Sequence, residues 1–295
     1  MFTGTYTAIV TPFQDGLVDE AALERLIKLQ VKAGVDGIVP VGTTGESPTL
    51  DFDEHIRVVE VSVRAAAGKI KVLAGTGANS TREAIELTQA AERAGADGSL
   101  QVAPYYNKPT QEGLFRHFTE IAASSRLPMV LYSIPGRCGI EISVETVVRL
   151  SKACKRIVGI KEAGGNPDRV SQMRQALGPR FTILSGDDSL TLPFMAVGAE
   201  GVISVASNVI PRETARMVSL YSSGNVGMAR KIHARYYPLF KDLFVESNPT
   251  PVKFALAKLG IIREECRLPL VPVSEKSREL LSATLKACGI LGRSK

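Results

Sequence analysis

The sequence lacks the features of an exported or membrane-embedded chain. Its first residues, MFTGTYTAIVTPFQDG, contain no basic start and no long apolar stretch that ends in small residues. No apolar run elsewhere approaches the roughly 20 residues that a membrane helix requires. We therefore expect a cytoplasmic protein without a membrane partner.

Cysteine and histidine are both scarce. The four cysteines are widely spaced and form no Cys-x-x-Cys pair, which argues against a zinc site and against a disulfide framework. Only three histidines are present, and none follows a segment expected to be a strand. The adjacent carboxylates Asp187 and Asp188 could suggest a metal, but with so few other ligand types we predict no metal site.

A block of basic residues interleaved with aromatic residues is also missing. The formal charge is +6, from 36 basic and 30 acidic residues, and it is spread along the chain. This pattern does not favour nucleic-acid binding and is compatible with anionic small substrates. The composition, with 44% hydrophobic and 22% charged residues, is that of a folded globular protein. A length of 295 residues allows one large α/β barrel or two ordinary domains.

A short phrase occurs three times along the chain. It contains a glycine that can end a helix in the left-handed conformation, then an acidic residue and a second glycine, then an apolar run typical of a buried strand. The three copies begin 61 and then 103 residues apart, which matches two and four βα units of about 25 to 30 residues. They are Ala33-Gly34-Val35-Asp36-Gly37-Ile38, Ala94-Gly95-Ala96-Asp97-Gly98-Ser99 and Val197-Gly198-Ala199-Glu200-Gly201-Val202.

These copies predict strands two, four and eight of an eight-stranded parallel sheet. The other strands are expected in the gaps, as short runs rich in β-branched and apolar residues. Helices are expected between them, with Asp19 as one N-cap and a capping box from Ser80 to Glu83 as another helix start. The remaining strand segments are residues 6–12, 72–76, 129–134, 157–161 and 181–185.

Regular strand–helix alternation would also fit a doubly wound sheet. The stretch from Gly75 to Asn79 is the nearest match to a dinucleotide fingerprint, but it lacks the third glycine and a suitable acidic residue about 20 positions later. We interpret it as a turn at a strand end, and we predict a (β/α)8 barrel over residues 1–224. Three helical segments, near 225–246, 250–260 and 274–289, follow as a C-terminal domain, 225–295, to which we assign no chemistry.

The side chains that act in a (β/α)8 barrel lie at the C-terminal ends of its strands. Lys161 follows the apolar run Ile157-Val158-Gly159-Ile160 and should lie at the mouth of the barrel. Burial lowers the pKa of a lysine, and a neutral amine can condense with a ketone. From position alone, a structural ion pair between Lys161 and a carboxylate such as Glu162 is an equally good explanation.

Other strand ends are less informative on their own. Tyr132 could transfer protons or could be a core tyrosine. Arg137 could bind a carboxylate through two hydrogen bonds or could lie on the surface. The turn Gly42-Thr43-Thr44-Gly45 could offer backbone N–H groups and hydroxyls to an anion.

Five motifs together resemble the N-acetylneuraminate lyase and dihydrodipicolinate synthase family of pyruvate-dependent class I aldolases. They occur in order and at the proper spacing, and the resemblance covers essentially the whole chain. The motifs are Gly42-Thr43-Thr44-Gly45-Glu46-Ser47, Ala103-Pro104-Tyr105-Tyr106-Asn107, Tyr132-Ser133-Ile134-Pro135-Gly136-Arg137, Gly159-Ile160-Lys161-Glu162-Ala163 and Phe244-Val245-Glu246-Ser247-Asn248-Pro249.

The resemblance implies a role for each of these positions. Lys161 would form the Schiff base with pyruvate, and Tyr132, Thr43 and Tyr106 would form a proton relay to which a neighbouring subunit supplies Tyr106. Thr43 and Thr44 would hold the pyruvate carboxylate, and Gly186 and Ile203 would line the pocket beside the lysine. The implied assembly is a homotetramer built as a dimer of dimers, and no cofactor is needed.

Arg137 distinguishes between the substrates used within the family. It would receive the carboxylate of L-aspartate 4-semialdehyde, whereas relatives that cleave sugar acids generally lack this arginine. The implied product is 4-hydroxy-tetrahydrodipicolinate, which feeds lysine and diaminopimelate synthesis. Ser133 departs from the asparagine usual at its position. A ligand-binding barrel without activity would share the same fold.

A regulatory site for lysine is also implied by the resemblance. Its five matching positions are Ser47, His55, Asn79, Glu83 and Tyr105. Pro48 and Phe52 depart from the pattern of lysine-sensitive enzymes, and Phe52 removes a hydrogen-bonding group. We therefore expect inhibition that requires millimolar lysine.

Overall fold

Eight parallel strands form a closed barrel in the computed structural model, which describes residues 1–292. The barrel closes because β1 pairs with both β10 and β4. The (β/α)8 prediction is confirmed, and the strands follow the order β1-β10-β9-β8-β7-β6-β5-β4 around the barrel. They are β1 (Gly4–Ala8), β4 (Gly37–Val39), β5 (Lys71–Gly75), β6 (Gly98–Val102), β7 (Met129–Ser133), β8 (Ile157–Glu162), β9 (Thr182–Ser185) and β10 (Gly201–Ser204).

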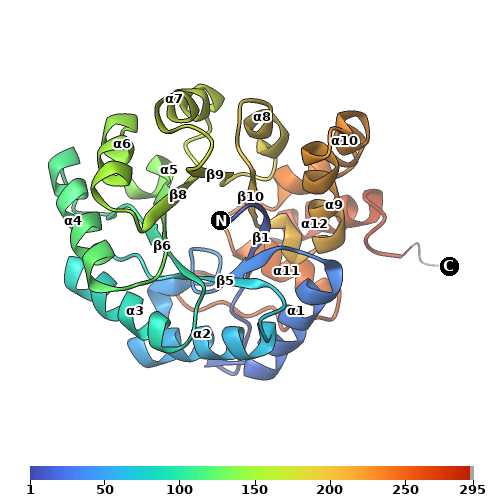
Figure 1. Ribbon diagram of the computed structural model, residues 1–295. Helices are drawn as coiled ribbons and strands as arrows, with labels where there is room; N and C mark the ends of the chain where they lie inside the picture. The colour runs from blue at the N-terminus through green and yellow to red at the C-terminus, as the bar shows by residue number, and fades with distance from the viewer. Residues whose placement is uncertain (293–295) are drawn as a thin grey trace.

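Helices surround the barrel as an outer ring (Figure 1). Each turns its apolar side to the strands, as the alternating sequence pattern requires. Shorter helical turns η1 (Ser47–Thr49), α5 (Pro135–Cys138) and η2 (Ala206–Asn208) follow strands at the end where the predicted site residues lie. The ring consists of α1 (Glu20–Ala33), α2 (Phe52–Ala66), α3 (Thr81–Arg93), α4 (Gln111–Ser124), α6 (Val144–Ala153), α7 (Pro167–Leu177), α8 (Thr191–Ala196) and α9 (Pro211–Ser222).

The three repeated phrases are helix-to-strand connections, as predicted. Their first glycines, Gly34, Gly95 and Gly198, have φ values of 81°, 88° and 109°, which an L side chain would rarely adopt. The acidic residue has a role that the sequence did not indicate, because the Asp36 carboxylate accepts a hydrogen bond from the N–H of Thr5 at the start of the neighbouring strand, at 2.7 Å. Asp97 of the second phrase accepts from the N–H of Val72 in the same way, at 2.9 Å, whereas the carboxylate of Glu200 in the third phrase pairs with Arg174.

Two expected helix starts are present, and one is only half formed. Asp19 caps α1 by accepting from the N–H of Ala22 at 2.9 Å. Ser80 caps α3, but Glu83 does not return a hydrogen bond to it, so the predicted capping box is wrong in its second half. Among residues 1–292 the Glu83 carboxylate makes no hydrogen bond, because its side chain lines a cavity instead.

The first strand is shorter than predicted. It ends at Ala8, not Pro12, because Val10 turns its N–H to the side chain of Asn208 at 3.2 Å instead of to a neighbouring strand. A small hairpin of β2 (Phe13–Gln14) and β3 (Leu17–Val18) follows and was not predicted. Its turn residues Asp15 and Gly16 both have positive φ, the conformation of an Asp-Gly hairpin turn, so a local signal was available.

The C-terminal helices are α10 (Val226–Asp242), α11 (Thr250–Lys258) and α12 (Glu275–Ala287), close to the three predicted segments. They lie beside α9 and α1 on one side of the barrel (Figure 1). Side chains such as Phe240 and Val252 are buried in the same apolar cluster as Ile9 and Leu26 of the barrel. The division into 1–224 and 225–295 stays a prediction, and its last three residues lie outside the described part.

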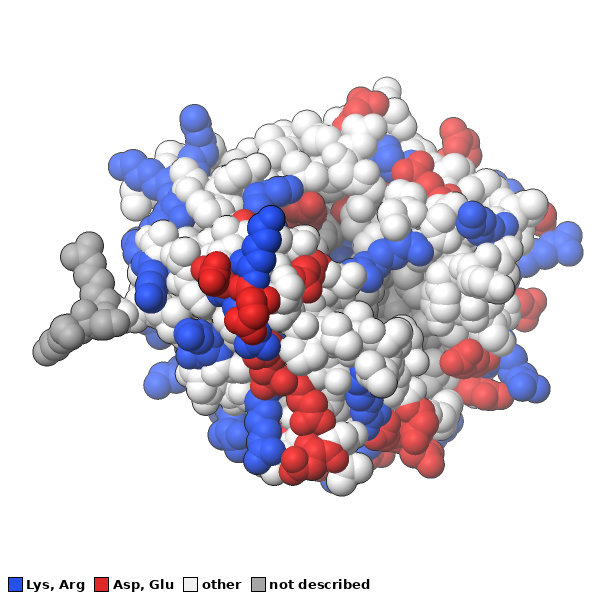
Figure 2. Space-filling model, turned by 180° about the vertical axis from the view of Figure 1, so that it is seen from behind, with Lys and Arg blue, Asp and Glu red and all other residues white. Residues whose placement is uncertain are grey.

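No helix within residues 1–292 is long and apolar enough to cross a membrane. On the face shown in Figure 2, Lys and Arg side chains alternate with Asp and Glu side chains. That face shows no continuous field of one sign of the kind that nucleic acid would require.

Candidate active site

Lys161 and Tyr132 lie side by side inside the barrel. They are register partners on β8 and β7, and the Nζ atom of Lys161 lies 4.1 Å from the centroid of the Tyr132 ring. Both residues are buried, and Tyr132 belongs to the apolar cluster at the centre of the barrel. This placement agrees with the predicted position of Lys161 at the barrel mouth.

Burial lowers the pKa of the Lys161 amine to about 7, because the charged form loses its hydration. The carboxylate of Asp188 acts in the opposite direction, and the guanidinium of Arg137 lowers the pKa further. An appreciable fraction of the amine is therefore neutral at neutral pH, which is the state that attacks a carbonyl.

Glu162 is not the partner of Lys161. Successive side chains on a strand point to opposite faces, so Glu162 points away from the barrel interior. Its carboxylate accepts from the guanidinium of Arg169 at 3.2 Å and from the N–H of Gly164 at 2.6 Å. The structural alternative for Lys161, an ion pair with Glu162, is therefore wrong.

Thr43 lies close to the hydroxyl of Tyr132. Burial raises the pKa of the Tyr132 phenol to about 12, and interaction with the Thr43 side chain lowers it in part. The phenol therefore keeps its proton at neutral pH. Thr43 itself lies in a tight turn in which Gly45 donates to the carbonyl of Gly42 at 3.0 Å. A side chain on Gly45 would collide with the backbone of Val41, so this turn requires glycine.

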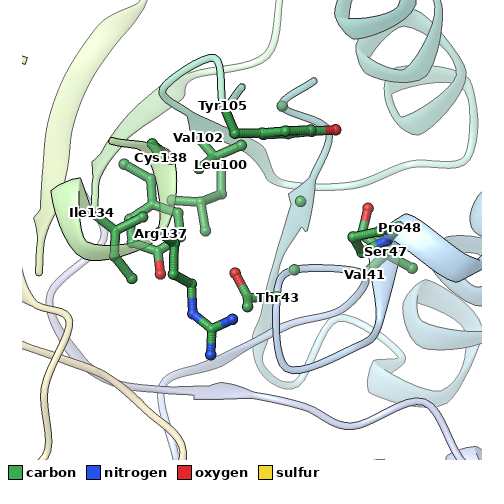
Figure 3. Close-up of a pocket in the computed structure, with 14 residues that line it drawn as sticks. Val41, Thr43, Ser47, Pro48, Leu100, Val102, Tyr105, Ile134, Arg137 and Cys138 are labelled. Atoms are coloured by element: carbon green, nitrogen blue, oxygen red, sulfur yellow. The ribbon is translucent and has the colours of Figure 1, made fainter. Parts of the chain in front are cut away.

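A pocket of about 230 Å³ reaches Tyr132 and Thr43, whereas Lys161, Gly186 and Ile203 are not among the residues that line it. Tyr132 and Thr43 line it, and Arg137 extends from α5 toward Thr43 (Figure 3). Arg137 is solvent-exposed. Its guanidinium makes one hydrogen bond within residues 1–292, from Nη2 to the carbonyl of Asn248 at 3.3 Å. A planar guanidinium in this position can bind a carboxylate.

Three further predicted residues, Gly186, Ile203 and Thr44, lie near Lys161, Tyr132 or Arg137. A Cβ atom on Gly186 would stand 3.1 Å from Cε of Lys161, so glycine leaves room for the lysine side chain. Ile203 is buried in the cluster that contains Tyr132. Thr44 is buried and accepts a hydrogen bond from Nδ2 of Asn248 at 2.9 Å.

Two residues near the site were given no role in it from the sequence. Asp188 is a buried carboxylate that accepts from the N–H groups of Val205 and Ala206, both at 3.0 Å. Asn248 lies in the C-terminal segment to which no chemistry was assigned, yet it contacts both Thr44 and Arg137. Only its place in one of the five motifs could have indicated it.

Tyr106 is not brought to this centre within one chain. Its side chain is 91% exposed, and its φ is 71°. Neighbouring Tyr105 lines the pocket instead. Tyr106 does not line the pocket of its own chain. Its predicted role in the active site of a neighbouring subunit requires an exposed side chain, which it has.

All five positions predicted for lysine line a second cavity, of about 350 Å³. Nε2 of His55 donates to the carbonyl of Gly75 at 2.9 Å, and burial lowers the pKa of His55 to about 4, so this ring is neutral at pH 7. Pro48 and Phe52 also line the cavity. It shares four wall residues with the first pocket: Ser47, Pro48, Gly77 and Tyr105.

Asp187 and Asp188 use their carboxylates to bind the chain itself. Oδ1 of Asp187 accepts from the N–H of Ser189 at 2.7 Å. Within residues 1–292, His, Cys, Asp and Glu side chains form no group of three or more that could hold a metal ion.

Comparison with known proteins defines the family. A model of the Dihydrodipicolinate synthetase family matches residues 1–288. The chain belongs to this family. The 4-hydroxy-tetrahydrodipicolinate synthase of Persephonella marina is 51% identical over 292 residues, which cover 99% of this chain and all of that one.

Solved structures of family members have the same fold. The 4-hydroxy-tetrahydrodipicolinate synthase of Methylacidiphilum fumariolicum SolV superposes with a TM-score of 0.97 at 56% identity and covers 98% of this chain and 96% of its own. Dihydrodipicolinate synthase (DHDPS) of Cyanidioschyzon merolae, solved with lysine bound, has a TM-score of 0.96 at 45% identity. The match covers 98% of this chain and 99% of that chain.

Proposed function

We propose that this chain condenses pyruvate with L-aspartate 4-semialdehyde through a Schiff base on Lys161. The product is 4-hydroxy-tetrahydrodipicolinate, a precursor for lysine and diaminopimelate. The main support is the Lys161 amine, which is buried against Tyr132 and has a pKa of about 7. The family match and the names of relatives at about half identity support the same reaction.

The first half of the reaction forms a nucleophile from pyruvate. Neutral Nζ of Lys161 attacks the ketone carbon, and loss of water leaves a protonated imine. The imine nitrogen then accepts the electron pair released when the methyl group of pyruvate loses a proton. This step gives an enamine and needs neither a metal nor an organic cofactor.

The second half forms the new carbon–carbon bond. The enamine carbon attacks the aldehyde carbon of the semialdehyde, and the alkoxide takes up a proton to become a hydroxyl group. The amino group of the substrate then attacks the imine carbon, which closes the ring and frees Lys161. One water is lost over the whole sequence. Tyr132, with Thr43 and Tyr106, is proposed to move the protons, because its phenol stays protonated at neutral pH.

Each substrate carboxylate has a proposed partner. Thr43 and Thr44 would bind that of pyruvate, and Gly186 and Ile203 would line the pocket beside the imine. Arg137 would bind that of the semialdehyde, because its guanidinium extends into the pocket (Figure 3). A sugar-acid aldolase would have no anionic group for Arg137 to bind at this end of the substrate. A coupled assay with pyruvate and aspartate semialdehyde, set beside cleavage of sugar acids, separates these two activities.

Borohydride trapping tests the Schiff base directly. Pyruvate with borohydride should add one reduced adduct to the protein, and peptide mass spectrometry should map it to Lys161. Lys161→Met should give no adduct. Lys253 is an internal control, because it is fully buried but paired with Glu46. An adduct on another lysine, or none in the unchanged protein, would contradict the proposed mechanism.

Tyr106 is proposed to act in the active site of a neighbouring subunit, within a homotetramer built from dimers. The exposure of its side chain supports this assignment. Mixing two inactive variants, Lys161→Met and Tyr106→Phe, would create hybrid dimers in which one of two sites has both residues. Recovery toward about a quarter of the original activity is expected for random pairing in a two-fold dimer. No recovery after subunit exchange would assign Tyr106 to its own chain.

The second cavity is proposed to bind lysine as a regulator. Glu83, whose carboxylate lines the cavity without a hydrogen bond to residues 1–292, would bind an ammonium group, and Asn79 the carboxylate end. The two cavities share a wall at Ser47 and Tyr105, so a ligand in one contacts residues that line the other.

A further inference from the structure

Asn248 connects the C-terminal segment to two residues of the proposed active site. It lies between α10 and α11 and is 5% exposed. Its Nδ2 donates to Oγ1 of Thr44 at 2.9 Å, and its backbone carbonyl accepts from Nη2 of Arg137 at 3.3 Å. One residue therefore contacts the proposed binding groups of both substrate carboxylates.

The direction of the bond to Thr44 has a chemical consequence. A hydroxyl group has a single proton to donate, and its oxygen can accept as well. Because Thr44 accepts from Asn248, its own proton stays available for another acceptor. Among residues 1–292 the Thr44 hydroxyl makes no other hydrogen bond, so that acceptor is not supplied by the described chain.

The other side-chain atom of Asn248 makes no hydrogen bond to the described chain. Oδ1 of Asn248 is buried without a hydrogen-bond partner among residues 1–292. Most buried polar atoms have a hydrogen-bond partner, and the Oε1 atom of Gln101 is another exception within residues 1–292. Asn248 makes its single side-chain hydrogen bond to Thr44.

We propose that Asn248 is a positioning residue that orients the Thr44 hydroxyl so that it donates to the carboxylate of the bound 2-oxo acid. The proposal rests on the proposed function, since it assumes that this carboxylate binds at Thr44. Asn248 acts through Thr44 and does not itself contact substrate. Its carbonyl holds Arg137 beside the same site.

A double-mutant cycle tests this role. Asn248→Ala should raise KM for pyruvate roughly threefold to twelvefold, the value of a neutral hydrogen bond, and should change kcat much less. Thr44→Val should raise KM to a similar extent. When Thr44 is already replaced by Val, Asn248→Ala should raise KM for pyruvate by a further factor of less than about two, because the two residues act as one unit. Additive effects, or an unchanged KM in Asn248→Ala, would overturn the proposal.

A near-isosteric variant gives a readout that a structural role would not produce. In Asn248→Asp the introduced carboxyl group donates to Thr44 when protonated and can only accept when ionised. The ordinary pKa of this carboxyl group is about 3.9, so the ratio of its KM for pyruvate to that of the unchanged protein should rise between about pH 4 and pH 6 and stay high above that range. A ratio independent of pH would overturn the proposal, and this variant keeps the test available if the alanine variant does not fold.

Thr250→Ala is the matched control in the same turn. Within residues 1–292 its hydroxyl donates to the carbonyl of Ser247 alone, at 2.9 Å, so its loss disturbs the segment without touching Thr44. Its KM for pyruvate should stay within about twofold of the original, and an increase equal to that of Asn248→Ala would mean that Asn248 only supports the turn. Borohydride trapping distinguishes failure of the proposed function from failure of the role of Asn248. If the unchanged protein traps no pyruvate, the proposed function is wrong. If it traps pyruvate but the effects of the two substitutions are additive, only the role of Asn248 is wrong.

Discussion

Lys161 Nζ lies 4.1 Å from the centroid of the Tyr132 ring, and the two residues face each other as register partners on adjacent strands. The ring covers one side of the amine, and Tyr132 also lines the pocket of about 230 Å³. One contact therefore brings together a lysine whose pKa is lowered to about 7 and a phenol whose pKa is raised to about 12. At neutral pH a partly neutral amine lies beside a protonated acid, the combination that Schiff-base formation requires.

The rate of pyruvate trapping should rise with pH, reach half of its plateau near pH 7 and level off above about pH 8. Only the neutral amine attacks, and with a pKa of about 7 its fraction increases roughly fifty-fold from pH 5 to pH 7. Arg137→Ala should move the midpoint to higher pH, because Arg137 lowers the pKa of Lys161. Initial trapping rates in a series of buffers measure both midpoints. A midpoint near pH 10 would mean that Lys161 is hydrated.

Replacing Lys161 should stabilise the protein while abolishing activity. In the unfolded chain this lysine has a pKa of about 10.4, whereas in the folded chain its pKa is about 7. Protonation therefore favours the unfolded state. The resulting loss of stability is largest below about pH 7 and disappears as the pH approaches about 10.4. Lys161→Met removes that cost. We expect its free energy of unfolding at pH 7 to rise by on the order of 2–4 kcal/mol and the difference to shrink as pH approaches 10. Urea unfolding at pH 7 and at pH 9.5 provides the comparison.

Lys253→Met should have the opposite effect on stability. Lys253 is fully buried, forms an ion pair with Glu46 and donates to the carbonyl of Glu265 at 2.8 Å. Removing one member of a buried pair leaves the other charge uncompensated, which costs about 3–5 kcal/mol. The double variant Glu46→Gln with Lys253→Met should recover much of this loss in the same urea assay. Equal losses in single and double variants would show that the pair contributes nothing as a unit.

Arg137→Ala should impair use of the semialdehyde much more than use of pyruvate. It removes a charge-assisted contact worth about 1.5–3 kcal/mol, and we expect kcat/KM for the semialdehyde to fall roughly tenfold to 150-fold. Pyruvate trapping at saturation and at pH 8 should be nearly unchanged. Arg149→Ala, which removes an exposed arginine paired with Glu112, is the control. Equal losses for both substrates would assign Arg137 to the fold.

Lysine should inhibit the reaction at millimolar concentration. Phe52 lines the cavity without a polar group, and one missing neutral contact reduces affinity about threefold to twelvefold. Glu83→Ala should abolish inhibition, whereas Glu86→Ala, which changes an exposed glutamate on the same helix, should leave it intact. Titration of L-lysine into the coupled assay gives the concentration for half-inhibition. A value in the low micromolar range would contradict the role given to Pro48 and Phe52, and no effect at tens of millimolar would exclude a regulatory site.

Several features of the fold could be predicted because their causes are local. The left-handed glycines Gly34, Gly95 and Gly198 indicate helix ends by themselves, since other residues rarely adopt their φ values. The extent of β1 could not be predicted, because the chain leaves the ladder only when Asn208, distant in sequence, accepts the N–H of Val10. The second half of the capping box at Ser80 failed for a similar reason, since the position of Glu83 depends on a cavity formed by other elements.

The amino-acid sequence by itself determined the eight strand–helix units, the place of Lys161 at a strand end and the family to which the chain belongs. These properties depend on short-range patterns of apolar residues, glycines and motifs. Only the tertiary structure decided that Lys161 lies against Tyr132 while Glu162 pairs with Arg169, and that Asn248 reaches Thr44 from the C-terminal helices. Desolvation and hydrogen-bond direction depend on which distant groups surround an atom, and that is known only when the barrel has closed.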